Sequence, residues 1–113
     1  MDPAQTRRVE NETLFREVNE RIEELSIGLA GGNEPDEFLG GFVCECGSDG
    51  CTELLQVRHS EYEAVRGDPR RFLIVAGHED LDAERVIERH ERYWVVQKFG
   101  EAAELASEHD PRS

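Results

Sequence analysis

The chain has 113 residues, of which 13 are Lys or Arg and 26 are Asp or Glu, so its formal net charge at pH 7 is -13. This acidity argues against nucleic acid or an anionic membrane surface as the main partner. No apolar run is long enough to span a bilayer, and the first residues lack the apolar core of a secretory signal, so we expect a cytoplasmic protein.

A long amphipathic helix is predicted at the N-terminus. Asp2 followed by Pro3 is typical of a helix start, with a capping side chain and a proline at the first helical position. Apolar residues then recur every three or four positions and form one stripe, with Phe15 beside it: Leu14, Val18, Ile22, Leu25 and Leu29. Residues 31–36 are rich in glycine and end the helix as a linker. The predicted division is an N-terminal helix with its linker over residues 1–33 and an α+β domain over residues 34–113.

The apolar stripe of this helix has two possible roles. It can pack on the sheet of the domain, or it can bind a protein partner or a second copy of the chain. The second role is suggested by length, because about 25 residues at 1.5 Å each would span roughly 37 Å, which exceeds the usual width of a domain of this size.

All three cysteines lie in the octet CECGSDGC, which reads C-x-C-x4-C over residues 44–51. The apolar residues before it predict a strand from Phe38, so Cys44 and Cys46 should leave the same face of that strand. Gly47 and Gly50 allow a tight turn that brings Cys51 back toward them. In a reducing compartment an odd number of clustered cysteines favours a metal site over a disulfide, although one disulfide with a free thiol, or three idle cysteines, is the alternative. Zinc bound by thiolates is usually four-coordinate, so three cysteines need a fourth ligand.

The next elements alternate strand and helix. Residues 53–58 should return antiparallel to the first strand, with the cysteine loop as the connection between them. A short helix should follow, with Ser60 and Glu63 as its capping box and Asp68-Pro69 as its end. The nearly continuous apolar run over residues 71–76 is typical of a strand buried on both faces, which we place in the centre of the sheet.

The histidines supply the candidates for the fourth ligand. His78 follows the predicted central strand directly and has a glycine before it, so it is the first choice. His59 is the second choice, because it lies next to a helix cap where its side chain would face water. His90 and His109 lie in polar surroundings and are expected to be exposed. The predicted metal ligands are therefore Cys44, Cys46, Cys51 and His78, with zinc as the cofactor.

The C-terminal third is predicted to hold a hairpin and a helix. Residues 93–99 form a strong strand, and residues 82–89 form a weaker one that connects to it through residues 90–92. A single helix over residues 80–92 is the alternative. A short helix follows Gly100, with Leu105 as its apolar anchor.

Two resemblances concern these segments. The octet resembles the zinc loop that follows SET methyltransferase domains, which implies that the three cysteines share zinc with a ligand from the neighbouring fold; the chain has no SET core, so methyltransferase activity is not implied. More of the chain resembles a group of small uncharacterised actinobacterial proteins, through the segments LFREVNERIEEL, FVCECGSDGC, SEYEAVRGDPRRF and GHED. That resemblance implies no activity.

The sequence as a whole predicts an α+β protein with a long N-terminal helix, a mainly antiparallel sheet of about five strands, two short helices and zinc at one edge. No catalytic motif supports an enzyme, and no residue is assigned a catalytic role. The favoured function is a small zinc-stabilised interaction or regulatory module. The alternatives are a thiol redox switch that releases zinc on oxidation and, less favoured, a zinc enzyme with an open coordination position near Glu79 or Asp80.

Overall fold

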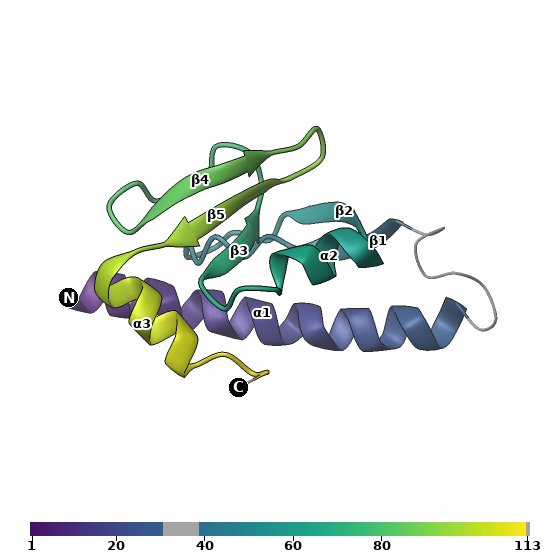
Figure 1. Cartoon of the computed structure of the whole chain (residues 1–113), viewed down its shortest axis with the longest axis horizontal. Helices are drawn as coiled ribbons and strands as arrows, with labels where there is room; N and C mark the ends of the chain where they lie inside the picture. The colour runs from purple at the N-terminus through teal and green to yellow at the C-terminus, as the bar shows by residue number, and fades with distance from the viewer. Residues whose placement is uncertain (31–38, 113) are drawn as a thin grey trace.

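The computed structural model describes the backbone of residues 1–30 and 39–112, and the side chains of residues 1–26 and 39–112. Its elements in chain order are α1 (Pro3–Ala30), β1 (Leu39–Val43), β2 (Leu54–Arg58), α2 (His59–Val65), β3 (Arg71–Ile74), β4 (Glu84–Arg89), β5 (Trp94–Lys98) and α3 (Gly100–Glu108). The predicted α+β fold is confirmed: α1 runs along the whole molecule, the strands and α2 lie on one side of it, and α3 crosses it near its N-terminal end (Figure 1). The predicted linker over residues 31–36, Phe38 and the side chain of Leu29 lie outside the described residues.

The five strands form two antiparallel sheets. β1 pairs with β2 from Leu39 opposite Arg58 to Val43 opposite Leu54, which is the hairpin predicted around the cysteine loop. The other sheet has the order β3-β5-β4. β4 and β5 form the predicted hairpin, so the alternative of one helix over residues 80–92 is wrong. A bulge between Val86 and Glu88 interrupts the β4 register and, with the charged side chains of β4, protects this edge strand from further pairing.

The prediction that β3 is the central strand is wrong, because β5 occupies that position. The free side of β3 is nevertheless covered. The Glu45 N–H donates to the Leu73 carbonyl at 2.8 Å, and the Leu73 N–H donates to Glu45 Oε1 at 2.9 Å. The cysteine segment therefore acts as an irregular neighbour of β3, which explains why β3 is buried on both faces although it lies at the edge of its sheet.

Helix α1 starts as predicted but packs through the opposite face. The Gln5 N–H donates to Asp2 Oδ1 at 2.8 Å, which confirms the N-terminal cap. Most of the described stripe does not pack on the sheet, because Leu14 is 55% exposed, Val18 40% and Leu25 59%, whereas Ile22 is partly buried against the core. The face turned toward the strands is mostly polar and consists of Val9, Glu12, Arg16, Asn19 and Glu23.

Backbone N–H and carbonyl groups that have no partner in a neighbouring strand explain why α1 packs through its polar face. Asn19 Nδ2 donates to the Val43 carbonyl at 2.9 Å and Asn19 Oδ1 accepts from the Val43 N–H at 2.8 Å, so the amide replaces a missing strand neighbour of β1. The Arg16 guanidinium donates to the carbonyls of Pro69 and Arg71 and stacks 3.8 Å above the ring centre of Phe72. Buried backbone groups need partners, and only polar side chains can supply them.

The core has two parts, one on each face of the β3-β5-β4 sheet. One part joins the buried cysteines to α1 and α3 and contains Val9, Cys44, Cys46, Phe72, Ile74, Ala83, Val96, Ala102 and Ala106. The other joins the β1-β2 hairpin to α2 and contains Phe42, Leu55, Val57, Tyr62, Val65, Leu73, Tyr93 and Val95. Alternation along β3 sends Phe72 and Ile74 to the first part and Leu73 to the second.

A charged cluster is buried between α1 and the sheet. Lys98, the only lysine of the chain, has its Nζ 2.7 Å from Glu12 Oε2 and 2.5 Å from Glu84 Oε1, and none of the three side chains is exposed. Burial raises the pKa of Glu12 to about 8, against the opposing effect of the Lys98 charge. A pKa of about 8 favours the neutral, protonated form of Glu12 at pH 7.

The short helices correct two further predictions. Helix α2 begins at His59, and its cap is the Arg58 N–H donating to Glu61 Oε1 at 2.8 Å, so the capping box lies two residues before the predicted one. In α3 the buried residues are Ala102, Ala103 and Ala106, whereas Leu105 is only partly buried, because small side chains allow α3 to pack closely.

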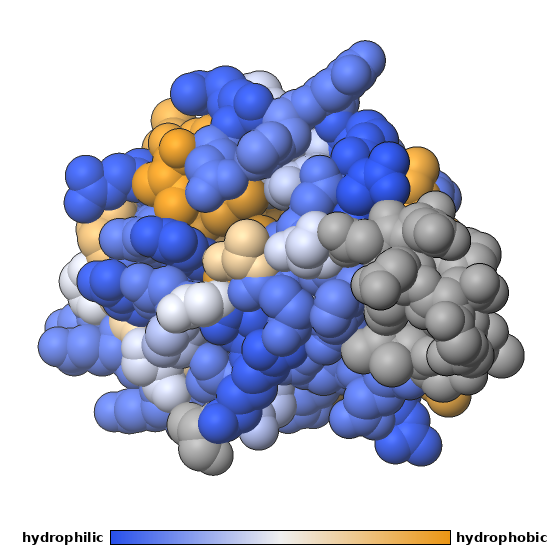
Figure 2. Space-filling view, turned by 45° about the vertical axis from the view of Figure 1, so that its right-hand side comes forward, coloured by the Kyte–Doolittle hydropathy of each residue, from blue (hydrophilic) through white to orange (hydrophobic). Residues whose placement is uncertain are grey.

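One face of the molecule is mainly hydrophilic (Figure 2). Figure 2 shows a face dominated by hydrophilic side chains, with apolar side chains gathered in separate patches. Across the described part of the chain, no helix is both long and apolar enough to cross a membrane.

Candidate metal centre

Cys44 and Cys46 continue the line of β1 and lie in the core. The Cys44 N–H donates to the Glu53 carbonyl at 3.0 Å, which extends the hairpin past its last ladder pair. The two cysteines leave one face of this extended segment and are 2% and 0% exposed, while Glu45 between them points to the other side. This is the alternation that the C-x-C spacing predicts.

The glycines of the loop make the turn that returns Cys51. Gly47 has φ +73° and Gly50 has φ +82°, backbone conformations that favour glycine. The Cys51 N–H donates to the Ser48 carbonyl at 3.2 Å and closes the turn. Gly47 has a second constraint, because a Cβ at this position would lie 2.5 Å from Glu12 Cγ and 2.6 Å from the Arg8 carbonyl oxygen. The loop can therefore lie against α1 only with glycine there.

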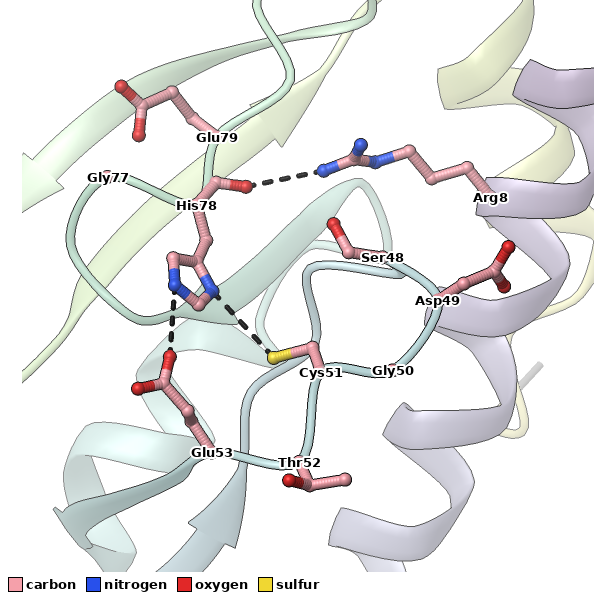
Figure 3. A pocket seen from close by; sticks show the side chains of 10 residues that line it. All are labelled: Arg8, Ser48, Asp49, Gly50, Cys51, Thr52, Glu53, Gly77, His78 and Glu79. Atoms are coloured by element: carbon pink, nitrogen blue, oxygen red, sulfur yellow. Dashed lines mark hydrogen bonds and ion pairs between the residues drawn. The ribbon is translucent and has the colours of Figure 1, made fainter.

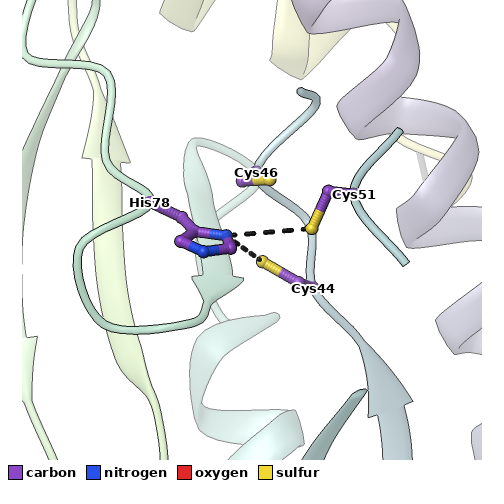
Figure 4. Close-up of side chains that lie close together, drawn as sticks. All are labelled: Cys44, Cys46, Cys51 and His78. Atoms are coloured by element: carbon purple, nitrogen blue, oxygen red, sulfur yellow. Dashed lines mark hydrogen bonds between the residues drawn. The ribbon is translucent and has the colours of Figure 1, made fainter. Parts of the chain in front are cut away.

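His78 comes from the turn after β3 and points into the cysteine loop. Gly77 has φ +89° and the His78 N–H donates to the Val75 carbonyl at 3.0 Å, so this turn is tight. His78 Nδ1 lies 3.7 Å from Cys44 Sγ and 3.7 Å from Cys51 Sγ. The four side chains converge on one point, as Figure 4 shows, and all four ligand atoms lie within 4.8 Å of one another.

These distances fit a tetrahedral metal ion. With Zn–S of about 2.3 Å and Zn–N of about 2.0–2.1 Å, ideal tetrahedral angles place sulfur and nitrogen about 3.6 Å apart and two sulfurs about 3.8 Å apart. The two measured Nδ1 to Sγ distances of 3.7 Å match the first value. The three cysteines are free thiols and not a disulfide, so Cys44, Cys46, Cys51 and His78 together could hold a metal ion.

The second nitrogen of His78 has the partner that metal-bound histidines usually have. His78 Nε2 lies 3.0 Å from Glu53 Oε2, and Figure 3 shows the ring between this carboxylate and Cys51. A carboxylate at Nε2 places the proton there and leaves the lone pair of Nδ1 directed at the sulfurs. Cys44 Sγ in turn accepts a hydrogen bond of 3.2 Å from the Val75 N–H, a contact that stabilises an anionic sulfur.

Electrostatics within the cluster favour a thiolate at Cys46. A hydrogen bond from Cys44 lowers the pKa of Cys46 to about 4, and the same hydrogen bond, followed by burial, raises the pKa of Cys44. Burial also raises the pKa of Cys51. The cluster thus keeps protons on two of its sulfurs, and these protons must leave when a metal binds, which makes the affinity depend on pH.

Helix α1 fixes the loop from the other side. Asn11 Nδ2 donates to the Gly47 carbonyl at 3.1 Å, and Arg8 Nη2 donates to the His78 carbonyl at 3.3 Å. Asn19 Nδ2 donates to Glu45 Oε2 at 2.8 Å, so the residue between the two buried cysteines is held by α1 and by Leu73 of β3. Both ligand-bearing segments therefore contact one rigid helix.

The structure brings together the four residues predicted as ligands and leaves the second-choice histidine elsewhere. His59 Nδ1 lies 3.1 Å from Glu23 Oε2 on α1. Sequence reasoning did not find Glu53, although its place two residues after Cys51 and opposite Cys44 in the hairpin is a usable signal. It also did not find Arg8, Asn11 or Asn19, because nothing local in the sequence indicates which loop a helix will contact.

Comparisons with known proteins supply no relative. No family model matches the chain, and neither the curated proteins nor the solved structures contain a match.

Proposed function

We propose that the protein is a small interaction module stabilised by one structural zinc ion bound to Cys44, Cys46, Cys51 and His78. The observation that carries the proposal is the convergence of three sulfurs and one imidazole nitrogen within 4.8 Å. Three thiolates and an imidazole are a donor set typical of structural zinc, and four protein ligands leave no open position for a substrate.

The position of the site supports a stabilising role. Cys44 and Cys46 belong to the core beside α1 and α3, whereas His78 lies on the turn between β3 and β4. A bound ion would join the two sheets through their connecting segments. Because metal binds the folded chain much more tightly than the unfolded one, its binding free energy adds to the stability of the fold.

Metal content and stability of matched variants test this proposal. The purified wild type should contain one zinc per chain by elemental analysis, and His78→Ala should lose most of it together with much of its resistance to urea. His59→Ala is the control and should keep its zinc, because His59 pairs with Glu23 away from the cluster. His78→Cys should restore zinc as a four-cysteine site. Zinc retained in His78→Ala, or no zinc in the reduced wild type after zinc is supplied, contradicts the proposal.

The exposed stripe of α1 supports the interaction role. Leu14, Val18 and Leu25 are apolar, exposed and aligned on the side of α1 that faces away from the sheets. Large apolar side chains aligned in this way are typical of a binding surface for another protein. The acidity of the chain makes duplex nucleic acid an unsuitable partner.

A thiol switch is the second candidate function, and the accessibility of Cys51 favours it. Cys51 is half-buried, unlike the other two cysteines, and it lines an open depression of about 540 Å³ together with His78 and Glu79 (Figure 3). A hydroperoxide could enter there. The Cys51 thiolate would attack the peroxide to give a sulfenic acid and an alcohol, and a second cysteine would then displace water to form a disulfide and release zinc unchanged.

Zinc release under peroxide distinguishes the two functions. A switch should release one zinc per chain at low peroxide concentration, with a disulfide that includes Cys51 by peptide mass spectrometry, and should take zinc up again after reduction. A structural site should keep its zinc under the same treatment.

A further inference from the structure

The outward face of α1 combines an apolar line with charges of both signs. With 3.6 residues per turn, Leu14, Val18 and Leu25 fall within an arc of about 40°, on the side of the helix away from the buried Asn19. Arg21 borders the line on the side away from Phe15, about 20° from Leu14; its side chain is 76% exposed, and its Nη1 lies 3.9 Å from Glu24 Oε2 of the same helix. Phe15 and Ile22 are partly buried and border the line on one side.

The other border of the line is acidic. Glu10, Glu17 and Glu24 repeat every seven residues, so they form a row along the helix beside the apolar line, and all three are exposed. A partner helix that covers the apolar line must therefore place its own charges against one arginine and a row of glutamates. A second copy of α1 could supply the matching charges, because Arg21 and Glu17 belong to the same helix.

Orientation decides whether two copies can use this match. In a parallel two-fold pair the flank of α1 that carries Arg21 and Glu17 would face the opposite flank of the partner helix, where Phe15 and Ile22 of the partner subunit lie, so these charges would have no charged partner. In an antiparallel pair that crosses between residues 19 and 20, Leu14 lies against Leu25 of the partner subunit. Arg21 then reaches Glu17 of the partner subunit, and the two-fold axis repeats each contact once.

We infer that α1 binds a second copy of the chain in this antiparallel arrangement. The inference rests on the interaction role in the proposed function and names the partner. The apolar line extends from Leu14 to Leu25, about 17 Å of helix, on one face only. Interfaces this small are typical of weak and reversible complexes, so the dimer forms as the protein concentration rises.

Sedimentation with charge reversal tests the pairing. The wild type should change from monomer to dimer with concentration, and Val18→Glu should stay monomeric. Arg21→Glu should weaken the dimer about tenfold or more, and the double variant Arg21→Glu with Glu17→Arg should restore it, because both copies then carry the reversed pair. Gln56→Glu, on the exposed face of β2, is the control and should leave the dimer unchanged.

Disulfide trapping tests the direction. Leu14→Cys mixed with Leu25→Cys should form a cross-linked dimer, whereas Leu14→Cys alone should not, because its two sulfurs would lie about 17 Å apart along the helices. Cross-linking of Leu14→Cys alone, a wild type that is monomeric at every concentration, or no recovery in the double variant overturns the inference. Zinc content is measured on the same samples: a zinc-loaded monomer refutes the dimer alone, whereas a wild type without zinc refutes the proposed function.

Discussion

The buried carboxyl group of Glu12 should make the protein less stable as the pH rises. Glu12 and Glu84 share the single ammonium group of Lys98, and all three side chains are fully buried. In the folded protein the pKa of Glu12 is raised by burial to about 8, whereas an unperturbed glutamate titrates near 4.5. Between these two pH values the folded state holds a proton that the unfolded chain has already released.

The size of the effect follows from proton linkage. A difference of one bound proton changes the free energy of unfolding by about 1.4 kcal/mol per pH unit. The contribution of Glu12 is fully present below about pH 4.5 and is lost progressively up to about pH 8, so its full range is on the order of 5 kcal/mol. Glu12→Gln keeps the shape of the protonated carboxyl group and cannot ionise.

Urea unfolding of the wild type and of Glu12→Gln at several pH values from 5 to 8 measures the effect. The free energy of unfolding of the variant, relative to the wild type, should rise by about 1.4 kcal/mol per pH unit over this range. Glu10→Gln is the control, because Glu10 is exposed on the same helix. Its free energy of unfolding, plotted against pH, should run parallel to that of the wild type. Other titrating groups are common to the three proteins and cancel in the difference. Parallel curves for Glu12→Gln would show that Lys98 keeps Glu12 ionised and would refute the reasoning.

Three substitutions test how the cysteine loop and β1 are held. Gly47→Ala and Gly50→Ala both place alanine at a positive φ, which should lower the free energy of unfolding by roughly 1–2 kcal/mol. Only Gly47→Ala also forces a Cβ against Glu12, so this variant should be clearly the less stable of the two in urea unfolding. Equal losses of stability would show that the loop is free to move away from α1. Asn19→Ala should cost at least about 2 kcal/mol in the same assay, because the N–H and carbonyl of Val43 lose their partner, and a loss below about 0.5 kcal/mol would show that water replaces the amide.

The cysteine loop could be predicted from the sequence because its determinants are local. The alternation of Cys44 and Cys46, the turn glycines and the position of His78 after a strand depend on neighbouring residues only, and the structure brings these side chains together. The fold class and the two hairpins were predictable for the same reason, since strand period and turn residues are short-range signals.

The face that α1 buries could not be predicted from the sequence. Pattern analysis assumes that apolar side chains face the core, but Arg16 and Asn19 are buried because distant backbone groups of Pro69 and Val43 need hydrogen-bond partners. The edge position of β3 was missed for a related reason, because Glu45 supplies its side chain and its N–H to Leu73 in place of a neighbouring strand. Such needs arise only after the chain has folded, and no periodicity in the sequence records them.

The burial of Lys98 has a consequence for amine chemistry. It is the only lysine in the sequence, and its Nζ has no exposed surface, so no side-chain amine can react with acylating reagents while β5 packs against α1. Acetylation of Lys98 therefore requires the core to open. The rate at which this amine reacts, followed by mass spectrometry, would report the frequency of that opening with no engineered probe.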